Sequence, residues 1–413
     1  MNRYATGEWL TWNFIAFSAV LGLAGTFGTV GFLLWASQGT LDLWGRPLGT
    51  DFSGAWTAGL MAVQGHAAEV YDWGQHAAVQ REIHHSPDVP FYGWHYPPFF
   101  LLLTSALALL PYLAALALYQ IGTFTAYALV VQRMLPGAKA LLIAAGFPAV
   151  LVCVGHGHNG FLTAALFGGA LLALGNRPNL AGILFGCLAY KPQFALVIPL
   201  ALLAGGYWRV LLSAASTVAA LSAAVFALWG WPIWQAFIDS GKLTRTIVLE
   251  RGATGWPKIQ SVFSWTRMLG GSIELAYIGQ GLVTAAVILG CAWLWRSKAD
   301  LALKGAGLAT AALMATPYVL DYDLVLLGIA IALLVARGLT YGFMHWEKTL
   351  LAVAWLAPGV TRSLATLVPL QLGFLTMAIL LSVILAKARR TDLLKRLRLG
   401  SPEAVPASVA QPA

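Results

Sequence analysis

The sequence has few charged residues. Asp, Glu, Lys and Arg together make up 10% of its 413 residues, whereas a soluble domain usually carries about 25%. Hydrophobic residues make up 59%, and they fall in runs of roughly twenty, the length of a helix that crosses a bilayer. This composition excludes a soluble globular domain. Because spanning backbone must satisfy its own hydrogen bonds, the runs predict transmembrane α-helices.

Cysteine is also scarce, with three residues in the chain, Cys153, Cys187 and Cys291. All three lie inside apolar runs without metal-binding or redox spacing, so a disulfide framework is excluded and each is read as a small buried hydrophobe. Negative charge is sparse too, with 16 acidic against 25 basic residues. The cations sit in short loops and in the C-terminal segment, which is the distribution of a membrane protein and not of a nucleic-acid-binding protein.

The apolar runs predict an all-α polytopic membrane protein with about 12 transmembrane helices. The first run, about 12–36, is longer than the ~7–15 residues of a signal-peptide core, so we expect an uncleaved span. Segment 96–110 is short for a span and is expected to be re-entrant or interfacial. We predict one transmembrane catalytic domain, 1–390, with external loops at 37–111 and 230–275, and a basic, then disordered, cytoplasmic tail, 391–413.

The basic loops, at 133–139, 177, 209, 296–304 and 337–348, predict the orientation of the chain in a plasma (inner) membrane. The positive-inside rule places them and both termini in the cytoplasm. The remaining polar clusters then share the extracytoplasmic face, and their convergence favours a site there. They are Asp51, His95-Tyr96, Gly155 to Gly160, Lys191-Pro192-Gln193, loop 239–274 and Asp321-Tyr322-Asp323.

Asp51 and Lys191 each allow two interpretations. Asp51 could act as a general base at the membrane surface, or it could cap a helix that begins near Ser53. Lys191, followed by the helix-breaking Pro192, could bind a phosphate or extend to the interface as a snorkelling side chain. The second external loop adds cations suited to an anionic headgroup, although each alone could be a solvated loop residue. These are Lys242, Arg245, Arg251, Lys258 and Arg267.

Two further clusters carry polar side chains at span ends. His156 and His158 are two residues apart, but no matching cluster supplies further metal ligands, so hydrogen bonding to a sugar or packing is favoured over a metal site. Asp321 and Asp323 could bind substrate hydroxyls, pair with loop arginines or cap a helix, since charges at such depth need a partner or water. Arg362 is a candidate partner.

Several short segments appear together in the order found in one family. They are Asp51-Phe52, Ala68 to Asp72, Tyr96-Pro97-Pro98, Asn159 to Thr163, Tyr190 to Gln193, and Thr316 to Asp323. In this set the chain resembles the polyprenol-phosphate-mannose-dependent glycosyltransferases of family 87, within the GT-C superfamily of membrane glycosyltransferases. The segments extend over about three quarters of the sequence.

The resemblance implies a reaction. In the family, an acidic residue of the first external loop deprotonates an acceptor hydroxyl, and Asp51 matches that residue here. The hydroxyl then displaces a polyprenyl phosphate from the anomeric carbon of a hexose, with inversion. Mannose is the family-level expectation for the hexose. The partners implied are a polyprenyl-phosphate-sugar donor, a glycolipid or glycan acceptor, and the bilayer. Cations stabilise the departing phosphate, so no obligatory metal is expected. The candidates are Lys191, Arg245, Arg251 and Lys258 for phosphate, and His95, Tyr96, His158, Asn159, Gln193, Asp321, Tyr322 and Asp323 for substrate.

Two other functions remain open. A transporter or lipid flippase would concentrate polar groups near mid-membrane, on broken helices in repeated halves. The predicted spans carry almost no charge at mid-depth and show no repeat, which favours surface chemistry. A non-catalytic relative that serves as an assembly factor is the third possibility.

Overall fold

The computed structural model describes residues 2–135 and 137–399, with side chains as far as residue 391. Over these ranges the chain is helical, and its extended segments form isolated bridges without any strand. The predicted all-α architecture is therefore confirmed.

Within residues 2–135 and 137–399, seven helices are long and apolar enough to cross a membrane. An eighth span results if α7 (Ala138–Ala145) and α8 (Pro148–His156) are counted together across a bend of 54°. Pro148 starts α8, where the missing amide hydrogen costs no helical bond. The seven are α2 (Trp12–Trp35), α6 (Tyr112–Met134), α12 (Trp208–Trp229), α15 (Ile273–Arg296), η7 with α17 (Asp321–Tyr341), α18 (Glu347–Leu367) and α19 (Leu372–Leu399).

The predicted count of about twelve crossings is not confirmed, because the remaining apolar helices are shorter than a span. Protein surrounds two of them, α9 (Gly160–Ala173) and α16 (Leu301–Met314), over most of their length. A helix enclosed by other helices does not need to match the thickness of the hydrocarbon core by itself. The other short helices are α5 (Leu101–Leu107), α10 (Pro178–Cys187) and α11 (Ile198–Ala204).

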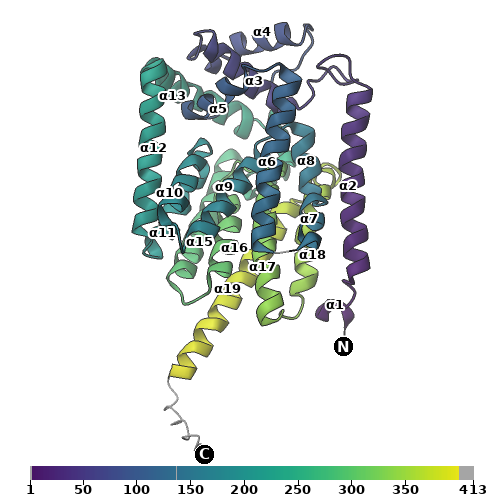
Figure 1. Cartoon of the computed structure of the whole chain (residues 1–413), viewed down its shortest axis with the longest axis vertical. Helices are drawn as coiled ribbons and strands as arrows, with labels where there is room; N and C mark the ends of the chain where they lie inside the picture. Colours follow the sequence, from purple (N-terminus) through teal and green to yellow (C-terminus); the bar gives the residue numbers. More distant parts are fainter. Residues whose placement is uncertain (1, 136, 400–413) are drawn as a thin grey trace, which may run out of the picture.

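Short helices cover one end of the bundle (Figure 1). Residues 37–111, predicted as the first external loop and named the first external segment for that reason, contribute α3 (Thr50–Val63), η1 (Glu69–Tyr71), α4 (Trp73–Ile83), η2 (Pro98–Phe100) and α5. Segment 96–110, expected to be re-entrant or interfacial, forms η2 and α5 and packs on α3. Gly54 permits close packing here, since a Cβ at this position would lie 2.5 Å from the Tyr92 carbonyl oxygen.

The second external segment covers the same end and contains α13 (Pro232–Thr244), the π-helical η5 (Arg245–Glu250), η6 (Trp256–Lys258) and α14 (Val262–Met268). Ile259 forms an isolated bridge with Leu320, and the Gln260 amide donates to the Val319 carbonyl at 2.8 Å. These bonds fix the second external segment to the chain that leads into η7.

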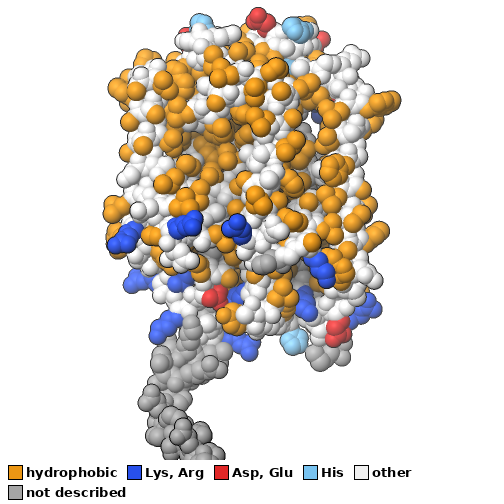
Figure 2. Space-filling model, in the orientation of Figure 1, with side chains coloured by type: hydrophobic (Ala, Val, Ile, Leu, Met, Phe, Trp, Pro, Cys, Tyr) orange, Lys and Arg blue, Asp and Glu red, His pale blue; other side chains and the backbone are white. Residues whose placement is uncertain are grey.

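Lys and Arg side chains gather at the opposite end of the bundle (Figure 2). The N-terminal helix α1 (Arg3–Thr6) and the last turns of α19 lie at this basic end as well (Figure 1). Within the predicted tail, 391–399 continue α19, and 400–413 lie outside the described residues.

Candidate functional site

The Asp51 carboxylate does not cap a helix. Helix α3 begins at Thr50, and its N-cap is Gly49, whose φ of +67° is in the left-handed region that favours glycine. No side chain caps this helix end. The Asp51 carboxylate instead lies 3.7 Å from the Lys258 ammonium nitrogen, with 22% of the Asp51 side chain exposed. The structure therefore excludes the capping interpretation of Asp51, whose carboxylate forms an ion pair instead.

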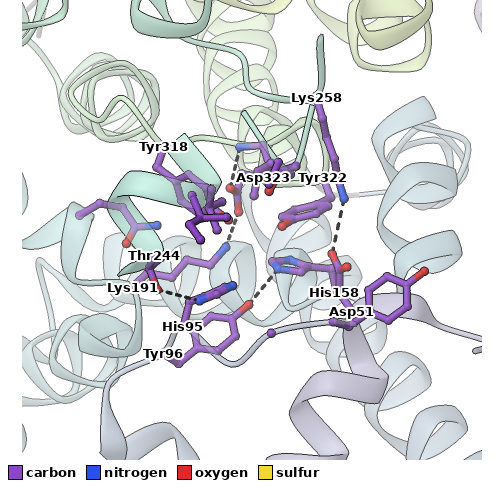
Figure 3. Close-up of a pocket in the computed structure, with 18 of the residues that line it drawn as sticks. Asp51, His95, Tyr96, His158, Lys191, Thr244, Lys258, Tyr318, Tyr322 and Asp323 are labelled. Atoms are coloured by element: carbon purple, nitrogen blue, oxygen red, sulfur yellow. Dashed lines mark hydrogen bonds and ion pairs between the residues drawn. The ribbon is translucent and has the colours of Figure 1, made fainter. Parts of the chain in front are cut away.

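Asp51 faces a cavity of 420 Å³ at the end covered by the short helices (Figure 3). Both external segments and several span ends line it. Of the residues expected from the sequence to form the site, the cavity is lined by Asp51, His95, Tyr96, His158, Lys191, Gln193, Lys258, Tyr322 and Asp323.

Lys191 sits at the break between two short 3₁₀ helices, η3 (Leu188–Tyr190) and η4 (Pro192–Leu196). Its side chain is 3% exposed and donates a hydrogen bond to Asp323 within a buried ion pair. The other oxygen of Asp323 accepts the Leu320 amide at 3.0 Å. Lys191 is therefore held inside the protein and does not snorkel to the interface.

His158 is positioned by the end of α8, where Gly157 takes a left-handed conformation with φ +62°. Its Nε2 lies 2.9 Å from the Tyr96 hydroxyl, and its ring stacks on Tyr322 at 3.5 Å between centroids. Lys258 lies over the same Tyr322 ring, 4.9 Å from its centroid. His158 Nδ1 is buried without a hydrogen-bond partner in the described part of the chain.

His95 joins the two external segments. Its Nδ1 lies 3.0 Å from the Thr244 hydroxyl at the end of α13. Burial lowers the pKa of His95 to about 4, while the nearby Asp51 charge raises it by a smaller amount. His95 is thus neutral at ordinary pH and can offer one donor and one acceptor.

A second set of contacts, through His156 and Arg362, holds the start of α3 in place. The Thr50 hydroxyl lies 3.0 Å from His156 Nδ1, and His156 Nε2 lies 3.4 Å from an Arg362 nitrogen. Because a guanidinium can only donate, Nε2 is the acceptor and Nδ1 carries the hydrogen. Arg362 also pairs with the buried Asp321 at 3.7 Å.

Four residues expected in the site do not line the cavity. Asp321 pairs with Arg362, as just described, and Asn159 is buried with its Oδ1 unsatisfied among the described residues. Arg245 is largely exposed and pairs with Glu250 at 3.3 Å. Arg251 is exposed to solvent. The cavity thus contains two of the four predicted phosphate-binding cations, Lys191 and Lys258.

Sequence reasoning missed part of the lining. Trp73, Tyr92 and Thr244 come from external helices and loops, where a single aromatic or hydroxyl residue carries no pattern. Tyr318 lies in one of the segments that carried the family resemblance, which was the available signal. No group of three or more His, Cys, Asp or Glu side chains suited to a metal occurs among the described residues.

Comparison with known proteins identifies the family of the chain. The family described as glycosyltransferase family 87 matches residues 94–317, which is more than half of the chain. No curated protein and no solved structure matches. The matched range includes His95, Tyr96, His158, Lys191, Gln193, Thr244 and Lys258 of the cavity, whereas Asp51, Trp73 and Tyr92 precede it and Tyr318, Tyr322 and Asp323 follow it. The resemblance seen in the sequence is confirmed, and the chain belongs to glycosyltransferase family 87, a family of membrane glycosyltransferases.

Proposed function

We propose that the protein transfers a hexose, with mannose as the first candidate, from a polyprenyl-phosphate-sugar donor to a glycolipid or glycan acceptor with inversion. The observation that carries the proposal is the arrangement in the cavity, where the Asp51 carboxylate and the cations Lys191 and Lys258 surround one enclosed space. Deprotonation of a hydroxyl and stabilisation of a departing phosphate need these two kinds of group.

Asp51 is the proposed general base. Its carboxylate accepts the proton of the acceptor hydroxyl while the hydroxyl oxygen bonds to the anomeric carbon. The bond from that carbon to the phosphate oxygen breaks with its electron pair, which leaves a polyprenyl monophosphate. The Lys258 ammonium, 3.7 Å away, pairs with the Asp51 carboxylate and restrains its direction.

Lys191 is the proposed phosphate-binding cation. It lies across the cavity from Asp51 (Figure 3), and inversion requires the base and the leaving group to be on opposite faces of the sugar. Its pairing with Asp323 holds the ammonium in place before the donor arrives. Because the leaving group is a monophosphate, the proposal includes no obligatory metal. His158 and His95 line the cavity and are the proposed contacts for the sugar.

The proposed active face is extracytoplasmic. Lys and Arg gather at the end of the bundle opposite the cavity, and the positive-inside rule places such an end, with both termini, in the cytoplasm of a plasma or inner membrane. A donor with a polyprenyl chain remains in the bilayer while its sugar reaches the cavity from the membrane surface.

A transporter or flippase is the competing function. Broken helices occur here, as in many transporters, at Lys191 and between α7 and α8. The charged groups of the cavity, however, include Asp51 and Lys258, which belong to the external segments. A site built largely from external segments is expected for surface chemistry.

A transfer assay in nanodiscs tests the proposal. The purified protein receives radiolabelled polyprenyl-phosphate-mannose with a glycolipid extract, and in parallel GDP-mannose with the same extract. Product from the lipid-linked donor alone, with the opposite anomeric configuration, supports the proposal. Product from GDP-mannose would overturn the donor assignment. If neither donor reacts, other prenyl-linked sugars are tested, and movement of labelled lipid between leaflets without transfer would support the flippase.

A further inference from the structure

A groove separate from the cavity lies between α10 and α12. It has a volume of 1070 Å³ and is lined from Arg177 and Arg209, at the start of the two helices, to Ile183 on α10 and Leu221 on α12. From Arg209 to Leu221 a helix rises about 18 Å, which is close to half of the roughly 30 Å hydrocarbon core. The groove therefore extends over the depth of one leaflet, beginning at the basic end.

The lower end of the groove carries positive charge. Arg177 and Arg209 both line it, and both are exposed. Neither guanidinium has a side-chain carboxylate or other partner in the described part of the chain, although other cations of the basic end are paired, such as Arg337 with Asp300 and Lys387 with Glu347. Two unpaired guanidiniums at the bilayer surface match an anionic headgroup.

Beyond the arginines, apolar side chains line the groove together with Ser213, Ser216 and Thr217, and the hydroxyls of Ser213 and Thr217 donate to backbone carbonyls. Leu180, Ile183 and Leu212 are 39%, 45% and 65% exposed, respectively, and they continue upward from the arginines along the two helices. A ligand with a negatively charged headgroup and a hydrocarbon chain fits this arrangement, because its headgroup would lie at the arginines and its chain along the apolar side chains. A protein segment or a soluble anion would match only one of the two parts.

The helices that form the groove are tightly joined. A Cβ at Gly182 would lie 2.4 Å from the Ser213 Cβ, and one at Gly186 would lie 2.6 Å from the Thr217 Cβ. This Gly-x-x-x-Gly spacing lets α12 approach the backbone of α10. Helix α10 leads through η3 directly to Lys191, so whatever binds the base of this helix pair also stabilises the element that carries Lys191 into the cavity.

We propose that the α10–α12 groove binds one anionic phospholipid of the membrane leaflet at the basic end. Its phosphate contacts Arg177 and Arg209, and an acyl chain covers Ile183 and Leu212. The bound lipid stabilises α10 and the position of Lys191. The proposal does not depend on the transferase reaction, since binding and stability are measured without a sugar donor.

The test uses the full-length protein in phosphatidylcholine nanodiscs with and without phosphatidylglycerol. Lipid retention is followed by native mass spectrometry, and thermal stability by melting temperature. The variant is Arg177→Gln/Arg209→Gln. The matched control is Arg133→Gln/Arg296→Gln, which removes two exposed arginines that end α6 and α15 at the same basic end.

We expect wild type and control to retain phosphatidylglycerol and to melt at a higher temperature in its presence. The groove variant should bind it on the order of 30-fold more weakly, since each cation near an anionic lipid contributes about five-fold. An equal loss in both double variants would overturn the proposal in favour of a general effect of surface charge. The proposal would also be overturned if wild type melted at the same temperature with and without phosphatidylglycerol, or if inorganic phosphate alone raised its melting temperature as much as phosphatidylglycerol does.

Discussion

The ammonium nitrogen of Lys258 lies 3.7 Å from the Asp51 carboxylate, although the two residues belong to different external segments. The same ammonium lies over the ring of Tyr322 at the start of a membrane span. One cation thus joins the proposed base to the rest of the cavity, and the two external segments close over the site together.

Removal of this cation should impair the reaction more than folding. We predict that Lys258→Gln lowers kcat/KM by roughly 10- to 100-fold, because the variant loses the cation that pairs with the proposed base, a loss of about 1.4–2.7 kcal/mol in transition-state stabilisation. Lys258→Arg should restore part of the activity because it keeps the charge. Steady-state transfer kinetics measure the effect, with Lys242→Gln on the exposed face of α13 as the control. Equal kinetics for the two Gln variants would remove Lys258 from the mechanism.

Variants of the buried pair Lys191 and Asp323 allow the effect on stability to be measured apart from the effect on activity. Lys191→Met leaves the Asp323 charge buried alone, and we predict a loss of about 3–5 kcal/mol in the free energy of unfolding. The double variant Lys191→Met/Asp323→Asn should recover most of that stability, because no unpaired charge remains. Its transfer activity should stay low, since the proposed phosphate-binding cation is missing. Denaturation in detergent and transfer assays measure the two effects. Recovery of activity in the double variant would show that Lys191 acts only in folding.

Packing beside Asp51 predicts a steric effect at Gly54. Gly54→Ala would place a Cβ 2.5 Å from the Tyr92 carbonyl oxygen, so α3 or the cavity-lining loop must move. We predict a loss of roughly 1–3 kcal/mol in stability together with a fall in transfer activity. Gly122→Ala is the control, because nothing lies within 4 Å of its added Cβ. If both variants match wild type in melting temperature, the described packing of α3 is wrong.

Three buried histidines of the first external segment, His76, His84 and His95, have lowered pKa values and predict sensitivity to acid. Burial lowers the pKa values of His76 and His95 to about 4 each, below the ordinary 6.5. Between these values the unfolded chain binds more protons than the folded chain, so stability falls as the pH drops from about 6.5 towards 4. Melting temperatures across this range should fall, and His76→Gln should reduce the fall. A flat profile would contradict the neutral, buried state of these side chains.

Much of the cavity could be predicted because its residues sit at the ends of apolar runs. Asp51, His158, Lys191 and Tyr322 follow from length, charge and order along the chain. The rotation of each residue about its helix could not be predicted. In the 3₁₀ helix η7, Asp323 faces the cavity and Asp321, two positions earlier, faces Arg362, and no sequence pattern distinguishes them.

The same limit applies to the loop cations and to the number of spans. Arg245 lies on a π-helical turn directed to Glu250, which leaves it outside the cavity although its charge matched the expected role. The count of about twelve crossings assumed that each apolar run must span the bilayer. Helices such as α9 and α16 are enclosed by other helices, so their lengths are set by protein packing and not by the membrane.

The most direct test of the central claim is transfer from polyprenyl-phosphate-mannose by wild type and Asp51→Asn in nanodiscs. The matched control is Asp88→Asn, which neutralises an exposed acid of the same external segment. Because a general base contributes about 10²- to 10⁴-fold, Asp51→Asn should lose at least 100-fold in kcat, with a melting temperature close to that of the control. Asp51→Asn activity within a few-fold of the control would show that Asp51 is not the base.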